Sequence, residues 1–161
     1  MILDKIFDFF LINNFSLSAV ESVTGGKLSS TIIKKSGASN FFKGSLVTYS
    51  TESKKNILQI NKDLLFNFSP VSKEISREMV KSGKKILNTD YCISTTGNAG
   101  PLTNDKYSKV GQIFISIATP KKITTEELYL TGPREEIIEI IVEKSLKLLL
   151  ENLVELSLIH I

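Results

Sequence analysis

The sequence has few of the residues that most often bind metals or act as general bases. Among 161 residues there is one cysteine, Cys92, and one histidine, His160. A single cysteine excludes an intrachain disulfide and is consistent with the reducing interior of a cell. Because Cys92 lies in an apolar segment without an obvious base and His160 lies next to the end of the sequence, we expect no histidine-dependent triad and no metal site.

Long hydrophobic runs are also missing. The first 17 residues are rich in Ile, Leu and Phe, but Asp4, Lys5 and Asp8 interrupt them before a signal-peptide core or a membrane span could form. We therefore expect a cytoplasmic protein with no membrane partner.

Neither sign of charge dominates the sequence. There are 20 basic and 17 acidic residues, which give a formal net charge of +3. The basic residues are scattered, several of them in pairs, and no polybasic run of the nucleic-acid-binding type is present. We expect no nucleic-acid partner.

The usual nucleotide-binding motifs are absent too. The paired glycines Gly25 and Gly26 are not followed by the Gly-Lys-Ser/Thr ending of a P-loop, and no GxGxxG motif follows a predicted strand. The sequence therefore gives little support to a triphosphate or dinucleotide site of a standard type.

Hydrophobic periodicity and capping residues predict one α/β domain over residues 1–161. Helices are predicted from the start to about Asn13, over 27–35, after an N-cap at Ser50, after an N-cap at Ser72, and from Pro133 to about Leu156. Strands are predicted over 16–20, 43–49, 91–95, 110–118 and 123–130, the last two as an antiparallel hairpin. This order favours a three-layer α/β/α domain with a mixed sheet covered by helices.

Three segments rich in Ser, Thr and Gly stand at the ends of predicted strands. They are residues 21–26 (ESVTGG), 47–54 (VTYSTESK) and 94–101 (STTGNAGP). Ligands bind at such strand ends in open α/β sheets. Each segment taken alone is as well explained by a capped helix start or a glycine-containing turn, and spacing alone does not separate Lys54 from Lys55 as a candidate base.

Taken together and in this order, the three segments resemble the C-terminal domain family of the competence/damage-inducible protein CinA. The family signatures Ala-Glu-Ser-x-Thr-Gly-Gly and Val-x-Tyr-Ser-x-x-x-Lys are matched at 20–26, with Val20 in place of alanine, and at 47–54. Thr96-Gly97-x-Ala99-Gly100-Pro101, Val110-Gly111 and the pair Gly132 and Arg134 continue the match, so the resemblance spans nearly the whole sequence.

The resemblance implies a nicotinamide-nucleotide amidase that hydrolyses nicotinamide mononucleotide to nicotinate mononucleotide and ammonia without a cofactor. Ser22 matches the nucleophile, Lys54 the base that takes its proton, and Tyr49 a residue that bridges or orients the pair. Such a lysine must have a lowered pKa to serve as base and then as acid. The residues that the resemblance implies for substrate binding are Glu21, Thr24, Gly25, Gly26, Thr96, Gly97, Gly100 and Arg134, with the backbone around Thr24, Gly25 and Gly26 able to hold either an oxyanion or a phosphate.

The sequence departs from the family in one segment. Residues 102–109 contain neither the glycines nor the Lys-Pro that the family has before Val-Gly, and Asn98 replaces a customary isoleucine. This departure motivates the alternative of a nucleotide-binding domain with weak or no catalysis.

The last predicted helix carries more apolar residues than one helix face needs. They could bury an interface between copies of the chain, or they could simply pack on the sheet. A homo-oligomer, most simply a dimer, is therefore predicted alongside a small-molecule nucleotide substrate.

Overall fold

A five-stranded mixed sheet forms the centre of the computed structural model, which describes residues 1–103 and 105–158. The strands are β1 (Leu17–Glu21), β2 (Phe42–Val47), β3 (Tyr91–Gly97), β4 (Gln112–Ala118) and β5 (Ile123–Tyr129). They lie in the order β2-β1-β3-β4-β5. β1 pairs in parallel with β2 and β3, whereas β3–β4 and β4–β5 are antiparallel. The predicted mixed sheet and the predicted hairpin are both confirmed.

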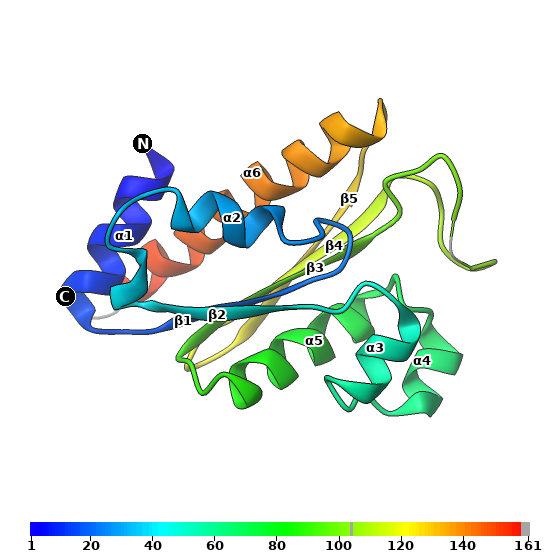
Figure 1. Cartoon of the computed structure of the whole chain (residues 1–161), viewed down its shortest axis with the longest axis horizontal. Coiled ribbons are helices and arrows are strands. Elements are labelled where there is room, and N and C mark those ends of the chain that lie inside the picture. The colour runs from blue at the N-terminus through cyan, green and yellow to red at the C-terminus, as the bar shows by residue number, and fades with distance from the viewer. Residues whose placement is uncertain (104, 159–161) are drawn as a thin grey trace.

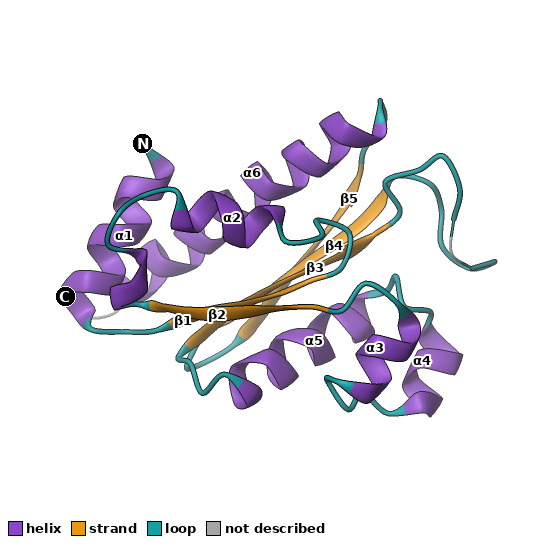
Figure 2. Cartoon of the chain, viewed as in Figure 1, coloured by secondary structure: helices purple, strands orange, loops and turns teal. Residues whose placement is uncertain are grey.

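Helices cover both faces of the sheet, so the predicted three-layer architecture is confirmed (Figures 1 and 2). One face carries α1 (Ile2–Asn13), α2 (Lys27–Ile33) and α6 (Arg134–Leu158). The other carries α3 (Thr51–Asn56), α4 (Lys62–Phe68) and α5 (Lys73–Ile86). The helix α4, capped by Asn61, was not predicted, because seven residues are too few to show a clear helical period. The residue His160 lies outside the described part of the chain.

Two hydrophobic clusters fill the layers. The larger cluster packs α1, α2 and α6 on the sheet, with an aromatic group in which Phe7 and Phe10 both contact Phe41. The smaller cluster packs α4 and α5 on the opposite face, around Val20, Ile75 and Met79. The glycine Gly83 lets α5 approach the sheet closely, since a Cβ there would meet Val20 Cγ2 at 2.3 Å.

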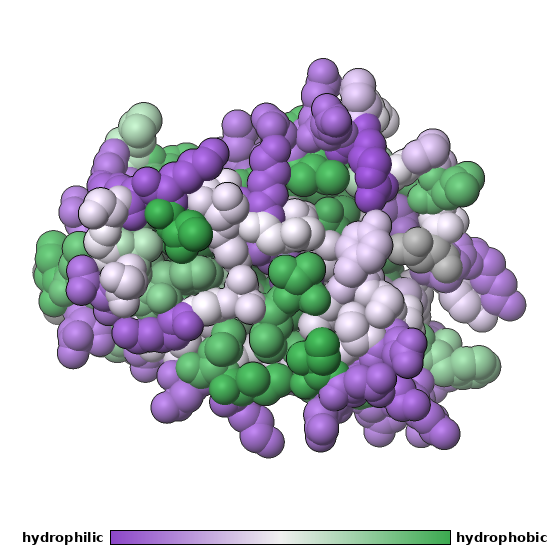
Figure 3. Space-filling view, viewed as in Figure 1, coloured by the Kyte–Doolittle hydropathy of each residue, from purple (hydrophilic) through white to green (hydrophobic). Residues whose placement is uncertain are grey.

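The apolar residues of α6 are used mainly inside this one chain. Eight of its apolar side chains are buried: Ile137, Ile141, Val142, Leu146, Leu148, Leu149, Leu153 and Leu156. On the face shown in Figure 3, apolar and polar groups are interspersed. The helix itself therefore gives no support for an interface, and the homo-oligomer stays a prediction.

Candidate active site

The turn after β1 is folded around the carboxylate of Glu21. This side chain is fully buried, and its oxygens accept hydrogen bonds from the backbone N–H groups of Gly26, Leu28 and Ser29 at 3.2, 2.9 and 3.0 Å. The hydroxyls of Thr24 and Ser29 donate to it as well. Glu21 thus serves the first N–H groups of α2, which a helix leaves unpaired. The carboxylate does not line the cavity, so the substrate-binding role expected for Glu21 is not supported, and it holds the turn between Ser22 and α2 instead.

Ser22 follows directly at the carboxyl end of β1. Its backbone N–H donates to the carbonyl of Thr95 on β3 at 2.9 Å, which extends the parallel pairing by one residue. Its hydroxyl oxygen lies 2.9 Å from Nζ of Lys54 and 3.4 Å from the carbonyl oxygen of Tyr49. The two side chains that the resemblance pairs are therefore within hydrogen-bonding reach of each other.

Lys54 comes from α3, whose start is fixed by a capping box between Ser50 and Ser53. Only 2% of Lys54 is exposed, although its neighbour Lys55 is exposed to solvent. Its Nζ also contacts the carbonyl oxygen of Thr48 at 3.0 Å, and no carboxylate pairs with it in residues 1–103 and 105–158. Burial lowers the pKa of Lys54 from 10.5 to about 8, because a charged amine is poorly solvated there.

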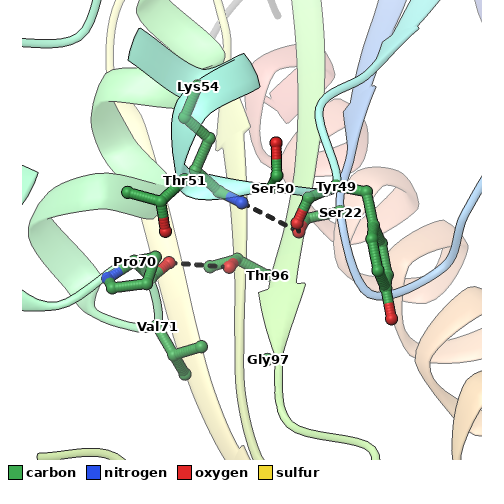
Figure 4. Close-up of a pocket in the computed structure, with 9 residues that line it drawn as sticks. All are labelled: Ser22, Tyr49, Ser50, Thr51, Lys54, Pro70, Val71, Thr96 and Gly97. Carbon is green, nitrogen blue, oxygen red and sulfur yellow. Dashed lines mark hydrogen bonds between the residues drawn. The ribbon is translucent and has the colours of Figure 1, made fainter. Parts of the chain in front are cut away.

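A cavity of about 280 Å³ opens over this pair (Figure 4). Its lining is Ser22, Tyr49, Ser50, Thr51, Lys54, Pro70, Val71, Thr96 and Gly97. The hydroxyl of Thr96 donates to the carbonyl of Pro70 at 2.8 Å, so its oxygen lone pairs are the groups left for a ligand. Gly97 is needed for packing, since a Cβ there would meet Ile113 Cδ1 at 2.3 Å.

A smaller hollow lies on the other side of Ser22, where Val23, Ala99 and Arg134 are among its walls. The guanidinium of Arg134 donates to the carbonyl of Gly100 at 2.7 Å and to the phenol oxygen of Tyr49 at 3.2 Å. Arg134 therefore ties the start of α6 to two segments of the site.

The side chain of Tyr49 does not bridge Ser22 and Lys54. Figure 4 shows its ring directed away from Lys54, and its hydroxyl is bound to Arg134. Tyr49 contacts Ser22 through its backbone carbonyl instead. Tyr49 is 61% exposed and lies two residues beyond the end of β2.

The turn also shows which N–H groups are available to a ligand. Those of Gly25 and Gly26 are already bound to the Ser22 carbonyl and to Glu21. In the described part of the chain, the N–H groups of Val23 and Thr24 have no acceptor. Of these two residues only Val23 lines the smaller hollow beside Ser22, and the sequence patterns did not single it out.

The divergent segment 102–109, in which residue 104 lies outside the described residues, is anchored to Ser69, the neighbour of Pro70 in the cavity lining. The carboxylate of Asp105 accepts bonds from the hydroxyl of Ser69 at 2.6 Å, from the N–H groups of Tyr107 and Ser108, and from the Ser108 hydroxyl. Burial raises the pKa of Asp105, but these hydrogen bonds outweigh it and the pKa lies below the usual value. The Asp-x-x-Ser pattern of this turn is a local signal that sequence reasoning had missed.

Within 1–103 and 105–158, no group of three or more His, Cys, Asp or Glu side chains is arranged to hold a metal ion. Over the same residues, no helix is long and apolar enough to cross a membrane.

Relatives of known sequence match most of this chain. A CinA-like protein of Flavobacterium psychrophilum is 41% identical over 140 residues, and one of Prochlorococcus marinus is 44% identical over 110 residues. These matches cover 87% and 68% of this chain but 34% and 25% of the relatives. The chain therefore spans about a third or less of the length of these relatives.

Solved structures agree with the fold. The competence or damage-inducible protein from Enterobacter asburiae has a TM-score of 0.91 at 28% identity, covering 94% of this chain and 96% of that one. The competence damage-inducible protein A from Klebsiella pneumoniae has the same TM-score at 24% identity, with 95% of each chain covered, which supports the fold. The family model of the CinA C-terminal domain matches residues 2–153. With this match over nearly its whole length, the chain belongs to the CinA C-terminal domain family.

Proposed function

We propose that this protein is a nicotinamide-nucleotide amidase that hydrolyses the carboxamide of nicotinamide mononucleotide by a serine–lysine mechanism. The observation that carries the proposal is the 2.9 Å contact between Lys54 Nζ and Ser22 Oγ at the base of a cavity. A buried lysine without a carboxylate partner is unfavourable for stability, and a lowered pKa in a cleft is typical of a catalytic group. The substrate follows from the resemblance to the family.

In the first half of the reaction, neutral Lys54 accepts the proton of the Ser22 hydroxyl while Ser22 Oγ attacks the carboxamide carbon. The carbonyl oxygen becomes an oxyanion, for which the N–H of Val23 is the candidate donor, since it has no acceptor among the described residues and Val23 lines the hollow beside Ser22. Collapse of this intermediate breaks the C–N bond. Lys54 returns its proton to the leaving nitrogen, so that ammonia departs and an ester with Ser22 remains.

In the second half, a water molecule attacks the ester carbon and Lys54 takes its proton. Collapse breaks the bond to Ser22 Oγ, which receives the proton back from Lys54, and the acid product leaves. Enzyme and base return to their starting state. One amine can perform every transfer because its pKa of about 8 lies near the working pH.

The decisive experiment is ammonia release from nicotinamide mononucleotide by the purified protein, with the acid product identified separately. Ser22→Ala and Lys54→Ala should each lower kcat by a factor of about 1000 or more. The matched controls Ser30→Ala and Lys85→Ala replace exposed residues and should leave turnover unchanged. Full activity in either dyad variant would contradict the mechanism.

The same protein samples distinguish the amidase from the alternative, a nucleotide-binding domain with weak or no catalysis. Binding of the mononucleotide by wild type, measured by calorimetry, without any ammonia release would support that alternative. It would also direct attention to the divergent segment 102–109.

A further inference from the structure

A groove of about 710 Å³ lies next to the catalytic cavity, between α3, α4 and the turn around Asp105. Its lining is Thr51, Glu52, Lys55, Lys62, Leu65, Phe66, Ser69, Pro70, Asp105, Lys106 and Tyr107. Thr51 and Pro70 also line the cavity over Ser22 and Lys54. A ligand whose reacting end lies in the cavity can therefore extend past these two residues into the groove.

Two aromatic rings in the groove are unusually exposed. Phe66 on α4 is 83% exposed and Tyr107 is 66% exposed. Neither is needed in the core, and aromatic faces of this kind bind flat rings by stacking. The groove thus offers a surface for a planar base rather than for an aliphatic chain.

The charge of the groove favours an anion. In the described part of the chain, none of the three lysines Lys55, Lys62 and Lys106 forms an ion pair. Of the two carboxylates present, Asp105 is occupied by four hydrogen bonds from Ser69, Tyr107 and Ser108, and Glu52 is exposed on α3. The ammonium of Lys106 lies 5.2 Å from the centre of the Tyr107 ring, so cation and aromatic face adjoin.

From this combination we infer that the groove holds the distal half of a dinucleotide, in which a pyrophosphate links the pyridine nucleotide to a second nucleotide. The lysines Lys55, Lys62 and Lys106 face the pyrophosphate, and the second base lies against Phe66 and Tyr107. The groove and the cavity share Thr51 and Pro70, which favours one ligand that occupies both over a single-stranded nucleic acid that would bind along the groove alone. The inference extends the proposed amidase to dinucleotide amides and rests on that function only for turnover, since binding needs no reaction.

Binding is tested first, with ADP as the probe because it carries a base and a pyrophosphate but no carboxamide. The full chain with Ser22→Ala is titrated by calorimetry, alone and with Phe66→Ala and Tyr107→Ala combined. The double substitution should weaken ADP binding at least tenfold. Tyr129→Ala, which removes an equally exposed tyrosine on β5 far from the groove in sequence, is the control and should leave the affinity unchanged. No saturable binding of ADP, equal affinity in the double variant, or tighter binding of a short oligothymidylate would overturn the inference.

Turnover is tested second, in protein that keeps Ser22. The ratio of kcat/KM for nicotinamide adenine dinucleotide to that for the mononucleotide should fall at least tenfold in the double variant. ADP binding without ammonia release from either compound would contradict the proposed amidase function but support nucleotide binding in the groove. Ammonia release from the mononucleotide without ADP binding would contradict nucleotide binding in the groove but support the proposed amidase function.

Discussion

Two parts of the candidate active site, named here the floor and the rim, are built around charged groups in opposite situations. In the floor, defined by Glu21, Ser22 and Lys54, both charged side chains are buried and neither has an ion-pair partner among the described residues. In the rim, defined by Tyr49, Asp105 and Arg134, the side chains are partly or fully exposed.

Both regions use one carboxylate to fold a turn. Glu21 gathers donors from residues 24–29, and Asp105 gathers donors from residues 69 and 107–108. Glu21 is fully buried, so no water can replace its carboxylate as acceptor for these donors. Asp105 is partly exposed, so water can reach the place of its carboxylate when that group is changed. The comparison teaches that amino-acid substitutions in the floor should be far more damaging than substitutions in the rim.

The largest effect should follow removal of the buried carboxylate. Glu21→Ala would leave the N–H groups of Gly26, Leu28 and Ser29 and two hydroxyls without their acceptor. We expect the free energy of unfolding to fall by about 3 kcal/mol or more, measured by urea denaturation. Glu151→Ala on the exposed side of α6 is the control and should change stability little. Equal stability of the two variants would refute the structural role assigned to Glu21.

The buried lysine should make stability depend on pH. The pKa of Lys54 is about 8 in the folded protein, below the usual lysine value of 10.5 that applies to the unfolded chain. Between these values the unfolded chain binds more protons, so stability should rise with pH across this window, by about 3 kcal/mol. Lys54→Met should remove that rise. Identical pH profiles from urea denaturation of wild type and Lys54→Met would show that Lys54 is not held in a desolvating site.

The pH dependence of catalysis should also reflect the titration of Lys54. In wild type, log kcat/KM should rise with pH up to an inflection near 8 and then level, since neutral Lys54 is the reactive form. A profile that is flat from pH 6 to 9 would assign the base to another group.

In the rim, Asp105→Asn should have a moderate effect. The amide keeps one acceptor oxygen for the turn but loses the charge that strengthens four hydrogen bonds. We expect a loss of about 1 kcal/mol of stability and less than a tenfold change in kcat/KM. A loss as large as that of Glu21→Ala would erase the distinction between floor and rim.

The smallest effect is expected for Tyr49→Phe. It removes only the exposed hydrogen bond to Arg134 at 3.2 Å and keeps the backbone carbonyl beside Ser22. We expect kcat to change by less than about threefold, in line with the loss of a weak exposed bond. A drop of a hundredfold or more would restore the role of the phenol as a bridge between Ser22 and Lys54.

Most of the fold was predictable from local patterns. The helix caps Ser50 and Ser72 and the hairpin over 112–129 depend on residues close in sequence, and all three are observed. The short helix α4 was not predicted, since its seven residues are held mainly by packing of Leu65 on the smaller hydrophobic cluster. The segment 102–109 resembled an open loop because its anchor, Ser69, is 36 residues away from Asp105.

The sequence by itself determined the order of the elements and, through its ESVTGG and VTYSTESK segments, pointed to Ser22 and Lys54, the residues proposed as nucleophile and base. Only the tertiary structure decided that Lys54 rather than Lys55 is buried, that Tyr49 turns outward to Arg134, and that Glu21 organises a turn. It also decided that Phe66 and Tyr107, 41 positions apart, line one groove. The physical reason is that burial, pKa and hydrogen-bond partners depend on atoms that the fold brings together from distant segments, which local propensity does not encode.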